Sequence, residues 1–315
     1  MSAENPDDGV FEELASLITE QPNERTERID RVPVAEALAL MNAEDACVAA
    51  AVAREIPEIA RLVEIARARV SGGGRIVYVG AGTSGRLGVL DAAECPPTFG
   101  TDPSQVVGIM SGGDRAVFRS VEGAEDDEAA GANAMEEAAV GKNDLVVGLA
   151  ASRRTPYVAA ALARARALGA ATALITCAPR KTVTIPVDIA ICPVVGPEAI
   201  MGSTRLKSGT AQKMVLNMLS TATMIQLGKV YKNMMVDLRA TSRKLRERSV
   251  RTLMTVAHLE RAAATELLAS ADGSVKTAIV MSRLAVSRDA ALARLDATGG
   301  HVSRALGEID GEPLR

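Results

Sequence analysis

Residues 75–86 read RIVYVGAGTSGR, a short apolar run that passes directly into a glycine-rich loop. The run is too short for a helix and lacks polar alternation, which is typical of a strand buried on both faces. Further runs of this kind lie at residues 106–110, 145–149, 172–176 and 189–192. Helical stretches separate most of them, such as Pro156–Leu168. The alternation predicts an α/β fold with a doubly wound parallel sheet and helices on both faces.

Helical patterns also flank the sheet on either side. A short helix around Phe11–Thr19 and a polar arm, Glu20 to Arg31, precede residues 34–70, where apolar positions recur three and four apart. A long helix is expected from Arg205 to Leu227, and the remaining signals are helices at Leu253–Leu268, Val275–Arg283, Ser287–Ala297 and His301–Leu306. We therefore expect an N-terminal arm with helices (1–70), a sheet domain (71–248) and a small all-helical C-terminal domain (249–315).

The composition of the 315-residue chain excludes several classes of protein. Hydrophobic residues make up 48% and charged residues 24%, with a net charge of −3, as in a globular protein. Aromatic residues are only 2%, which disfavours the base-stacking platforms of nucleic-acid binders. No run approaches the roughly 18 apolar residues of a membrane span, and the start, MSAENPDDGV, does not resemble a secretory signal. We expect a cytoplasmic protein that binds neither nucleic acid nor membrane.

The four cysteines offer no metal site. Cys47, Cys95, Cys177 and Cys192 lie far apart, and the chain has two histidines. A zinc cage needs closely spaced Cys and His ligands, so we expect no metal. The cysteines are interpreted as small apolar core residues.

Two loops that follow strands have the residue types of a phosphate site. In the first, Gly82 allows close backbone approach to an anion, and Thr83 and Ser84 add hydroxyl donors at a helix start. The same loop matches G-x-G-x-x-G, but a dinucleotide site needs an acidic residue about 20 positions on. The nearest one after the second strand, Asp114, is 29 positions beyond Gly85. A monophosphate is favoured, while a dinucleotide site and a purely structural turn remain alternatives.

The second loop follows the strand at residues 145–149 and precedes a helix whose first turn holds Pro156. Ser152 and Thr155 are its hydroxyl donors. Taken alone, the loop is equally well explained as a helix N-cap without a ligand. Two hydroxyl-bearing loops on successive strand–helix units favour one shared anion.

Long blocks of the chain resemble the N-acetylmuramic acid 6-phosphate etherase family, in the same order from about Ile29 to the C-terminal helices. The blocks are residues 71–100, 121–126, 155–157, 202–213 and 235–237. The resemblance implies a sugar-isomerase (SIS) domain with a small helical C-terminal domain, acting as a homodimer in cell-wall recycling without a cofactor. The implied reaction cleaves the D-lactyl ether of N-acetylmuramic acid 6-phosphate to N-acetylglucosamine 6-phosphate and D-lactate.

The resemblance also assigns roles to single residues. Glu94 matches the acid that protonates the lactate oxygen, and Glu125 matches the base that removes a proton from carbon 2 of the opened sugar. Without the resemblance, the acidic run around Glu125 would be interpreted as a solvated helix start. The remaining matches bind substrate or its phosphate: Gly82, Thr83, Ser84, Ser152, Thr155 and Lys244. Lys207 and Lys213 could add positive charge there or lie on the surface or at a dimer contact.

Two positions depart from the family pattern. Arg153 stands where the pattern has Gly, and an arginine is strained if the backbone φ is positive there. Ser242 replaces an Asn in the Asn-x-Lys-Leu motif. These departures keep open a non-catalytic sugar-phosphate regulator, as in the similar regulatory protein of glucokinase. An aldose–ketose isomerase and a nicotinamide dehydrogenase are further alternatives.

Overall fold

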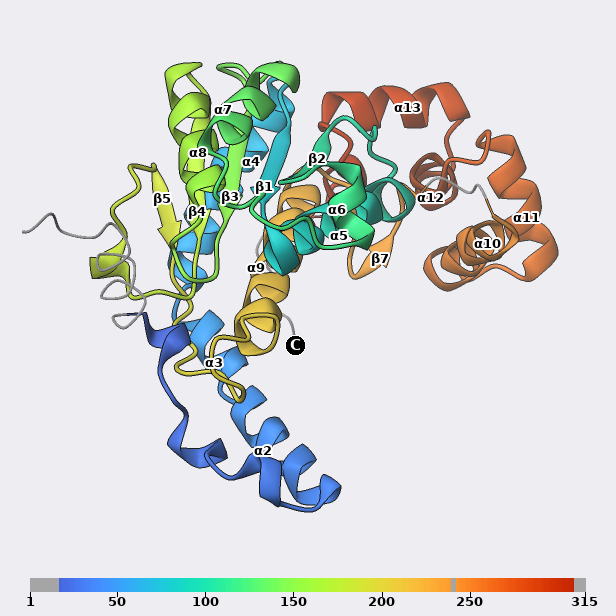
Figure 1. The fold of residues 1–315 in the computed structure, drawn as a ribbon. Coiled ribbons are helices and arrows are strands. Elements are labelled where there is room, and N and C mark those ends of the chain that lie inside the picture. Colours follow the sequence, from blue (N-terminus) through green and yellow to red (C-terminus); the bar gives the residue numbers. More distant parts are fainter. Residues whose placement is uncertain (1–16, 239–241, 309–315) are drawn as a thin grey trace, which may run out of the picture. The chain divides into compact units, whose positions relative to one another are not determined.

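The computed structural model describes residues 17–238 and 242–308, within which the chain forms two compact units (Figure 1). The first unit comprises residues up to Ala93 together with Ser104–Leu219, and the second comprises Glu94–Pro103 and the residues from Ser220 on. Two helices, α5 (Gly82–Phe99) and α9 (Lys207–Gln226), contribute residues to both units. Most of the helix expected around Phe11–Thr19 lies outside the described residues.

The first unit is built on the five strands that the sequence predicts. They are β1 (Ile76–Gly80), β2 (Val106–Met110), β3 (Leu145–Leu149), β4 (Ala171–Ile175) and β5 (Ile189–Ile191). All pairs are parallel, in the order β2-β1-β3-β4-β5. Every residue of β1, β3 and β4 is buried, as expected for strands covered on both faces. The predicted α/β fold with a parallel sheet is confirmed.

Helices cover both faces of this sheet (Figure 1). The helix α8 (Pro156–Ala167) packs on β1, β3 and β4 and lies beside α7 (Glu128–Glu137). Val77 and Val79 of β1 share a core with α7 and α8. The helix α4 (Ile56–Ser71) packs on β1, β3 and β5. This unit also contains the helices α2 (Val34–Asp45), α3 (Val48–Ala53) and α6 (Asp114–Phe118) and the 3₁₀ turn η4 (Arg180–Thr182).

The strand order reverses between β1 and β3, and this position determines where a ligand can bind. From β1 the chain continues to β2 on one side, whereas β3 leads away to β4 and β5 on the other. The connections that leave β1 and β3 therefore diverge, and ligands of such sheets bind in the gap at the carboxyl ends of the strands. Both hydroxyl-bearing loops of the sequence analysis begin at this point.

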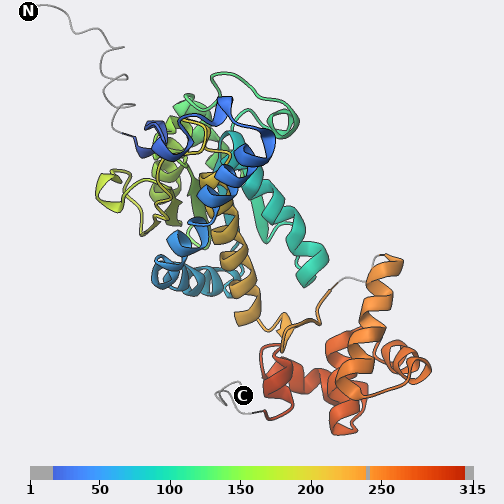
Figure 2. The same cartoon turned by 90° about the horizontal axis from the view of Figure 1, so that it is seen from below.

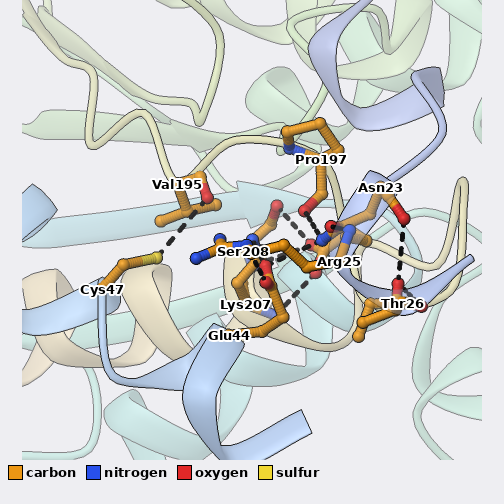
Figure 3. Close-up of polar contacts among 11 residues, drawn as sticks. Asn23, Arg25, Thr26, Glu44, Cys47, Val195, Pro197, Lys207 and Ser208 are labelled. Carbon is orange, nitrogen blue, oxygen red and sulfur yellow. Dashed lines mark hydrogen bonds and ion pairs between the residues drawn. The ribbon is translucent and has the colours of Figure 1, made fainter. Parts of the chain in front are cut away.

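The predicted polar arm, Glu20 to Arg31, and the three residues before it form a chain of 3₁₀ turns fixed to the first unit; residues 17–31 are called the arm below. The turns are η1 (Ile18–Glu20), η2 (Glu24–Thr26) and η3 (Ile29–Arg31). The amide of Asn23 donates to the Pro197 carbonyl oxygen at 3.1 Å (Figure 3). The hydroxyl of Thr26 donates to the Ala199 carbonyl oxygen at 2.9 Å. The arm is thus held against the segment that precedes α9.

The buried ion pair between Lys207 and Glu44 anchors the arm to the first unit. Lys207 and Glu44 have 1% and 2% of their side chains exposed, and Lys207 Nζ lies 2.6 Å from Glu44 Oε2 (Figure 3). Asn23 donates to the same carboxylate at 2.8 Å, and Arg25 Nε lies 2.6 Å from its other oxygen. Burial alone would raise the pKa of Glu44, but the hydrogen bonds of Lys207 and Asn23 and the charges of Lys207 and Arg25 outweigh it and lower that pKa. The expectation that Lys207 adds charge to a phosphate or lies at the surface is wrong.

The second unit contains a short antiparallel hairpin, β6 (Val230–Tyr231) with β7 (Met234–Met235), and a group of helices (orange to red in Figure 2). The helices are α10 (Arg243–Ala257), α11 (Arg261–Ser270), α12 (Val275–Leu284), α13 (Arg288–Ala297) and α14 (Val302–Ala305). Tyr231 and Val236 share one core with Leu253 and Ile279, so this unit begins before residue 249.

One predicted helix of the C-terminal region is divided in two. The sequence pattern indicates a single helix over Leu253–Leu268, but α10 ends at Ala257 and α11 begins at Arg261. His258 caps α10 in the left-handed conformation, with a φ of 53°. Histidine is a less usual residue there than glycine, so the break has no strong local signal.

Burial of the cysteines agrees with their interpretation as core residues for three of the four. Cys95, Cys177 and Cys192 are buried, whereas Cys47 is half-buried. Burial raises the pKa of Cys177 to about 12 and that of Cys192 to about 11, which keeps both side chains as neutral thiols.

Within residues 17–238 and 242–308, no helix combines the length and the apolar composition needed to cross a bilayer.

Replacing Lys207 by Met should lower the free energy of unfolding by about 3–5 kcal/mol, because the buried Glu44 carboxylate loses the cation that is buried with it. Chemical denaturation of the first unit measures the effect. Arg205→Met is the control, since Arg205 is an exposed cation two residues before Lys207, and we expect this variant to lower the free energy of unfolding by less than about 1 kcal/mol. Equal costs for the two variants would contradict an anchoring role for Lys207.

Candidate active site

A cavity of about 280 Å³ lies at the carboxyl edge of the sheet, where the strand order reverses. It brings together several of the predicted site residues, namely Gly82, Thr83, Ser84, Glu125, Ser152 and Thr155. These residues come from three segments that are far apart in the sequence, so the shared location comes from the fold. The prediction that both loops face one space is consistent with this geometry.

The first loop connects β1 to α5 at very close range. A Cβ atom on Gly85 would lie 2.6 Å from the Gly80 carbonyl oxygen, so only glycine lets the helix start this near to the strand end. Gly82 has a φ of 54° and lies exposed on the cavity wall. The first backbone N–H groups of α5, from Gly82 to Ser84, have no partner within the helix. They are the natural donors for an anion in this cavity.

The hydroxyl of Ser84 is already used within the protein. It donates to Gln212 Oε1 at 2.7 Å, and both side chains are buried. Ser84 can therefore contribute to an anion through its backbone N–H, whereas Thr83 has a half-exposed side chain on the cavity wall. Thr83 and Ser84 are both predicted as hydroxyl donors, but the Ser84 hydroxyl is buried against Gln212 whereas Thr83 is half-exposed.

In the second loop, the Thr155 hydroxyl does not cap the helix α8 that follows it. Thr155 occupies the N-cap position of α8, yet its side chain makes no capping hydrogen bond. Thr155 is 8% exposed and lines the cavity, together with Ser152 and Arg154. The N-cap explanation therefore does not account for the Thr155 hydroxyl.

The acidic run divides into two parts with different surroundings. Asp127 caps α7 by accepting a hydrogen bond from the Ala130 backbone N–H at 2.8 Å, as a solvated helix start would. Glu125 and Asp126 precede the cap and line the cavity. The Tyr157 backbone N–H donates to the Glu125 carbonyl oxygen at 3.0 Å and so fixes this segment against α8.

Glu125 also borders a second cavity of about 190 Å³. The two cavities share Ala81, Gly82 and Glu125 as lining residues. The guanidinium of Arg86 lines the second one and is held by the carbonyl oxygens of Ala116 and Val117, at 2.8 and 2.9 Å. Glu125 thus borders two neighbouring cavities.

Two predicted site residues are not among those that line these cavities. Glu94 is an exposed residue of α5 and belongs to the second unit. Lys244 lies on α10 and lines a separate cavity of about 490 Å³ within the second unit. The assignments of Glu94 and Lys244 remain predictions.

Residues that the sequence analysis leaves without a role also line the main cavity. Leu17 and Glu20 come from the arm, and Gly202 and Thr204 come from the segment before α9. The backbone N–H of Gly202 donates to the Thr19 carbonyl oxygen at 2.9 Å and joins the two segments. The acidic residue Glu20 in a polar segment is a sequence signal for a functional role, but no local pattern connects this segment with the two loops.

The two departures from the family pattern have distinct structural consequences. Arg153 has a φ of 63°, the conformation that favours glycine, and it is absent from the cavity lining, whereas Arg154 is present. Ser242 is the N-cap of α10 and accepts a hydrogen bond from the Leu245 backbone N–H at 3.2 Å. Serine and asparagine are both good N-caps, so this role survives the replacement.

Replacing Arg153 by Gly should stabilise the first unit by about 1 kcal/mol, since the left-handed conformation no longer strains a side chain. The melting temperature should rise by about 2–4 °C in calorimetry. Arg119→Gly is the control, because Arg119 is exposed and has an extended backbone with a φ of −141°. That variant should be destabilised, and a fall in stability for Arg153→Gly as well would refute the strain.

Comparison with known proteins assigns the chain to a family. Residues 58–166 match the family described as the glucokinase regulatory protein N-terminal SIS domain, and residues 125–222 match the SIS domain family. The N-acetylmuramic acid 6-phosphate etherase of Salinibacter ruber is 55% identical over 298 residues, which cover 94% of this chain and 96% of that protein. The enzymes of the same name from Mycolicibacterium smegmatis and Aeromonas hydrophila are 50% and 49% identical, over 94% and 93% of this chain and 99% and 98% of their own lengths. The chain therefore belongs to the N-acetylmuramic acid 6-phosphate etherase family.

Proposed function

We propose that this protein cleaves the D-lactyl ether of N-acetylmuramic acid 6-phosphate to give N-acetylglucosamine 6-phosphate and D-lactate. The observation that carries the proposal is the cavity in which the two hydroxyl-bearing loops meet the Glu125 segment. The relatives described above, all named as etherases, support the same reaction and do not favour a non-catalytic regulator.

The 6-phosphate is proposed to sit at the N-terminus of α5. The free N–H groups of Gly82, Thr83 and Ser84 and the positive end of the helix dipole suit a phosphate. Thr83, Ser152 and Thr155 add hydroxyl donors from the two loops. The first N–H groups of α8 contribute less, because Pro156 has none and Tyr157 donates to Glu125.

The reaction is proposed to proceed by elimination and hydration. In the opened sugar, the aldehyde acidifies the proton on carbon 2, and Glu125 removes it as the base. The electron pair forms a double bond between carbons 2 and 3 while the ether bond on carbon 3 breaks. The departing lactate oxygen takes a proton, and water then adds to the double bond at carbon 3.

The proton for the lactate oxygen is proposed to come from Glu94. This role rests on the family resemblance of the segment that ends α5. One acid and one base complete the proton balance: Glu125 takes the proton from carbon 2 and returns it there during hydration, and the water that adds to carbon 3 gives up one proton to the Glu94 carboxylate, which restores the acid. A place in peptidoglycan recycling in the cytoplasm is proposed on the same resemblance.

A homodimer is also proposed. Val34 and Leu38 lie one helical turn apart on α2 and are 76% and 60% exposed in the single chain. Two large apolar side chains on one helix face favour a protein contact there. Together with the family resemblance, this exposed pair supports association of two copies.

The wild-type protein should release D-lactate from N-acetylmuramic acid 6-phosphate. Glu125→Gln should lower that rate by at least about 100-fold and should also abolish exchange of the carbon 2 proton with deuterated water, because no base remains. Glu94→Gln should abolish lactate release but retain the exchange. Lactate is measured enzymatically and exchange by NMR.

Controls separate the alternatives. Glu128→Gln changes a nearby exposed carboxylate that lines neither cavity and should leave turnover near normal. Tight substrate binding without lactate release would indicate the regulator, and a rearranged sugar with an intact ether would indicate an isomerase. Near-normal turnover of Glu94→Gln would reject the acid assignment.

The dimer should be visible by sedimentation at micromolar concentration. Leu38→Glu should shift it toward the monomer, because a charge is buried at the contact. Glu36→Gln, an exposed change on another face of α2, should leave the mass unchanged. A monomeric wild-type protein would exclude this proposal.

A further inference from the structure

The arm places one more carboxylate in the wall of the cavity. Glu20 is the last residue of η1 and lines the cavity with Thr83, Ser152 and Glu125. Within the described part of the chain, its carboxylate makes no hydrogen bond and no ion pair. A carboxylate that borders a cavity without a protein partner is left to accept hydrogen bonds from water or from a ligand.

The position of Glu20 is fixed by its neighbours on both sides. The Gly202 backbone N–H holds the Thr19 carbonyl oxygen at 2.9 Å. Gly202 has a φ of 76°, and a Cβ atom there would lie 2.9 Å from Glu20 Oε2. Glycine at this position therefore makes the room that the Glu20 carboxylate occupies.

The buried ion pair secures the same stretch a few residues later. Asn23 donates to the carboxylate of Glu44, which pairs with Lys207 inside the protein (Figure 3). A short arm that is bound at Thr19 and again at Asn23 has little freedom in between. Glu20 is thus presented to the cavity by an ordered support, as a residue that determines binding must be.

The chemistry of the carboxylate limits what Glu20 can bind. An ionised carboxylate only accepts hydrogen bonds, and it is repelled by a phosphate dianion. A hexose phosphate donates hydrogen bonds mainly through its several hydroxyls, to which an N-acetylated sugar adds one amide N–H. We propose that Glu20 accepts hydrogen bonds from hydroxyl groups of the bound hexose and so orients the sugar ring above the phosphate loops.

This inference rests on the proposed function in one respect, that the ligand is a hexose phosphate. It gives Glu20 a role in selecting the sugar, separate from the proton transfers assigned to Glu94 and Glu125. The phosphate donors would hold any small phosphate, and Glu20 would distinguish a polyhydroxylated one. Loss of Glu20 should therefore weaken the binding of the sugar part of the ligand and leave the binding of the phosphate group unchanged.

The test compares two probes, N-acetylglucosamine 6-phosphate and inorganic phosphate, by calorimetric titration of the full chain. Glu20→Ala should weaken binding of the sugar phosphate by about 10- to 100-fold, the loss expected for a hydrogen bond to a charged acceptor. Binding of inorganic phosphate should change by less than about twofold. Glu27→Ala, an exposed change on the same arm, should leave both affinities unchanged.

Each other outcome counts against the inference. Unchanged affinity for the sugar phosphate would show that Glu20 does not contact the sugar, and equal weakening for both probes would indicate displacement of the arm. If Glu20→Ala unfolds, Glu20→Gln supplies the same comparison without loss of volume. If the wild-type protein binds no sugar phosphate, both the proposed function and this inference are refuted. If the wild-type protein binds it and Glu20→Ala binds it equally well, only the inference is refuted.

Discussion

The reversal of strand order between β1 and β3 is the constraint on which the candidate site depends. Because the chain leaves these neighbouring strands in opposite directions, a gap opens above their carboxyl ends. The start of α5 can lie at this gap only because Gly80 and Gly85 let the helix touch the strand end. The unpaired N–H groups of α5 and the hydroxyl of Thr155 then border the same space. The location of the site is a property of the topology.

Much of this could be predicted from the sequence because the signals are local. A strand buried on both faces is a continuous apolar run, so all five strands were recognisable without any knowledge of their partners. The glycines and hydroxyls of the two loops come directly after strands, where a parallel sheet presents them at one edge. The break between α10 and α11 was missed for the converse reason, since His258 adopts a left-handed conformation with neither glycine nor proline to mark it.

The arm shows what local patterns cannot predict. Lys207 follows the segment before α9 and looks like a surface lysine, but its partner Glu44 is 163 positions earlier in the chain. A buried charge is tolerated only with such a partner, and the pairing depends on how α2 and α9 lie in the folded unit. The same pairing brings the arm, and with it Glu20, to the cavity. A long-range ionic contact thus determines a part of the site that no motif indicates.

The charges around the cavity bear on the proposed phosphate site, whose proposed donors are mostly neutral. Among the described residues that line it, Glu20, Glu125 and Asp126 are acidic and Arg154 is basic. A lysine close to Glu125 would stabilise the carboxylate and weaken it as a base. Backbone N–H groups and hydroxyls can hold a phosphate without that cost, since their dipoles act over a short range.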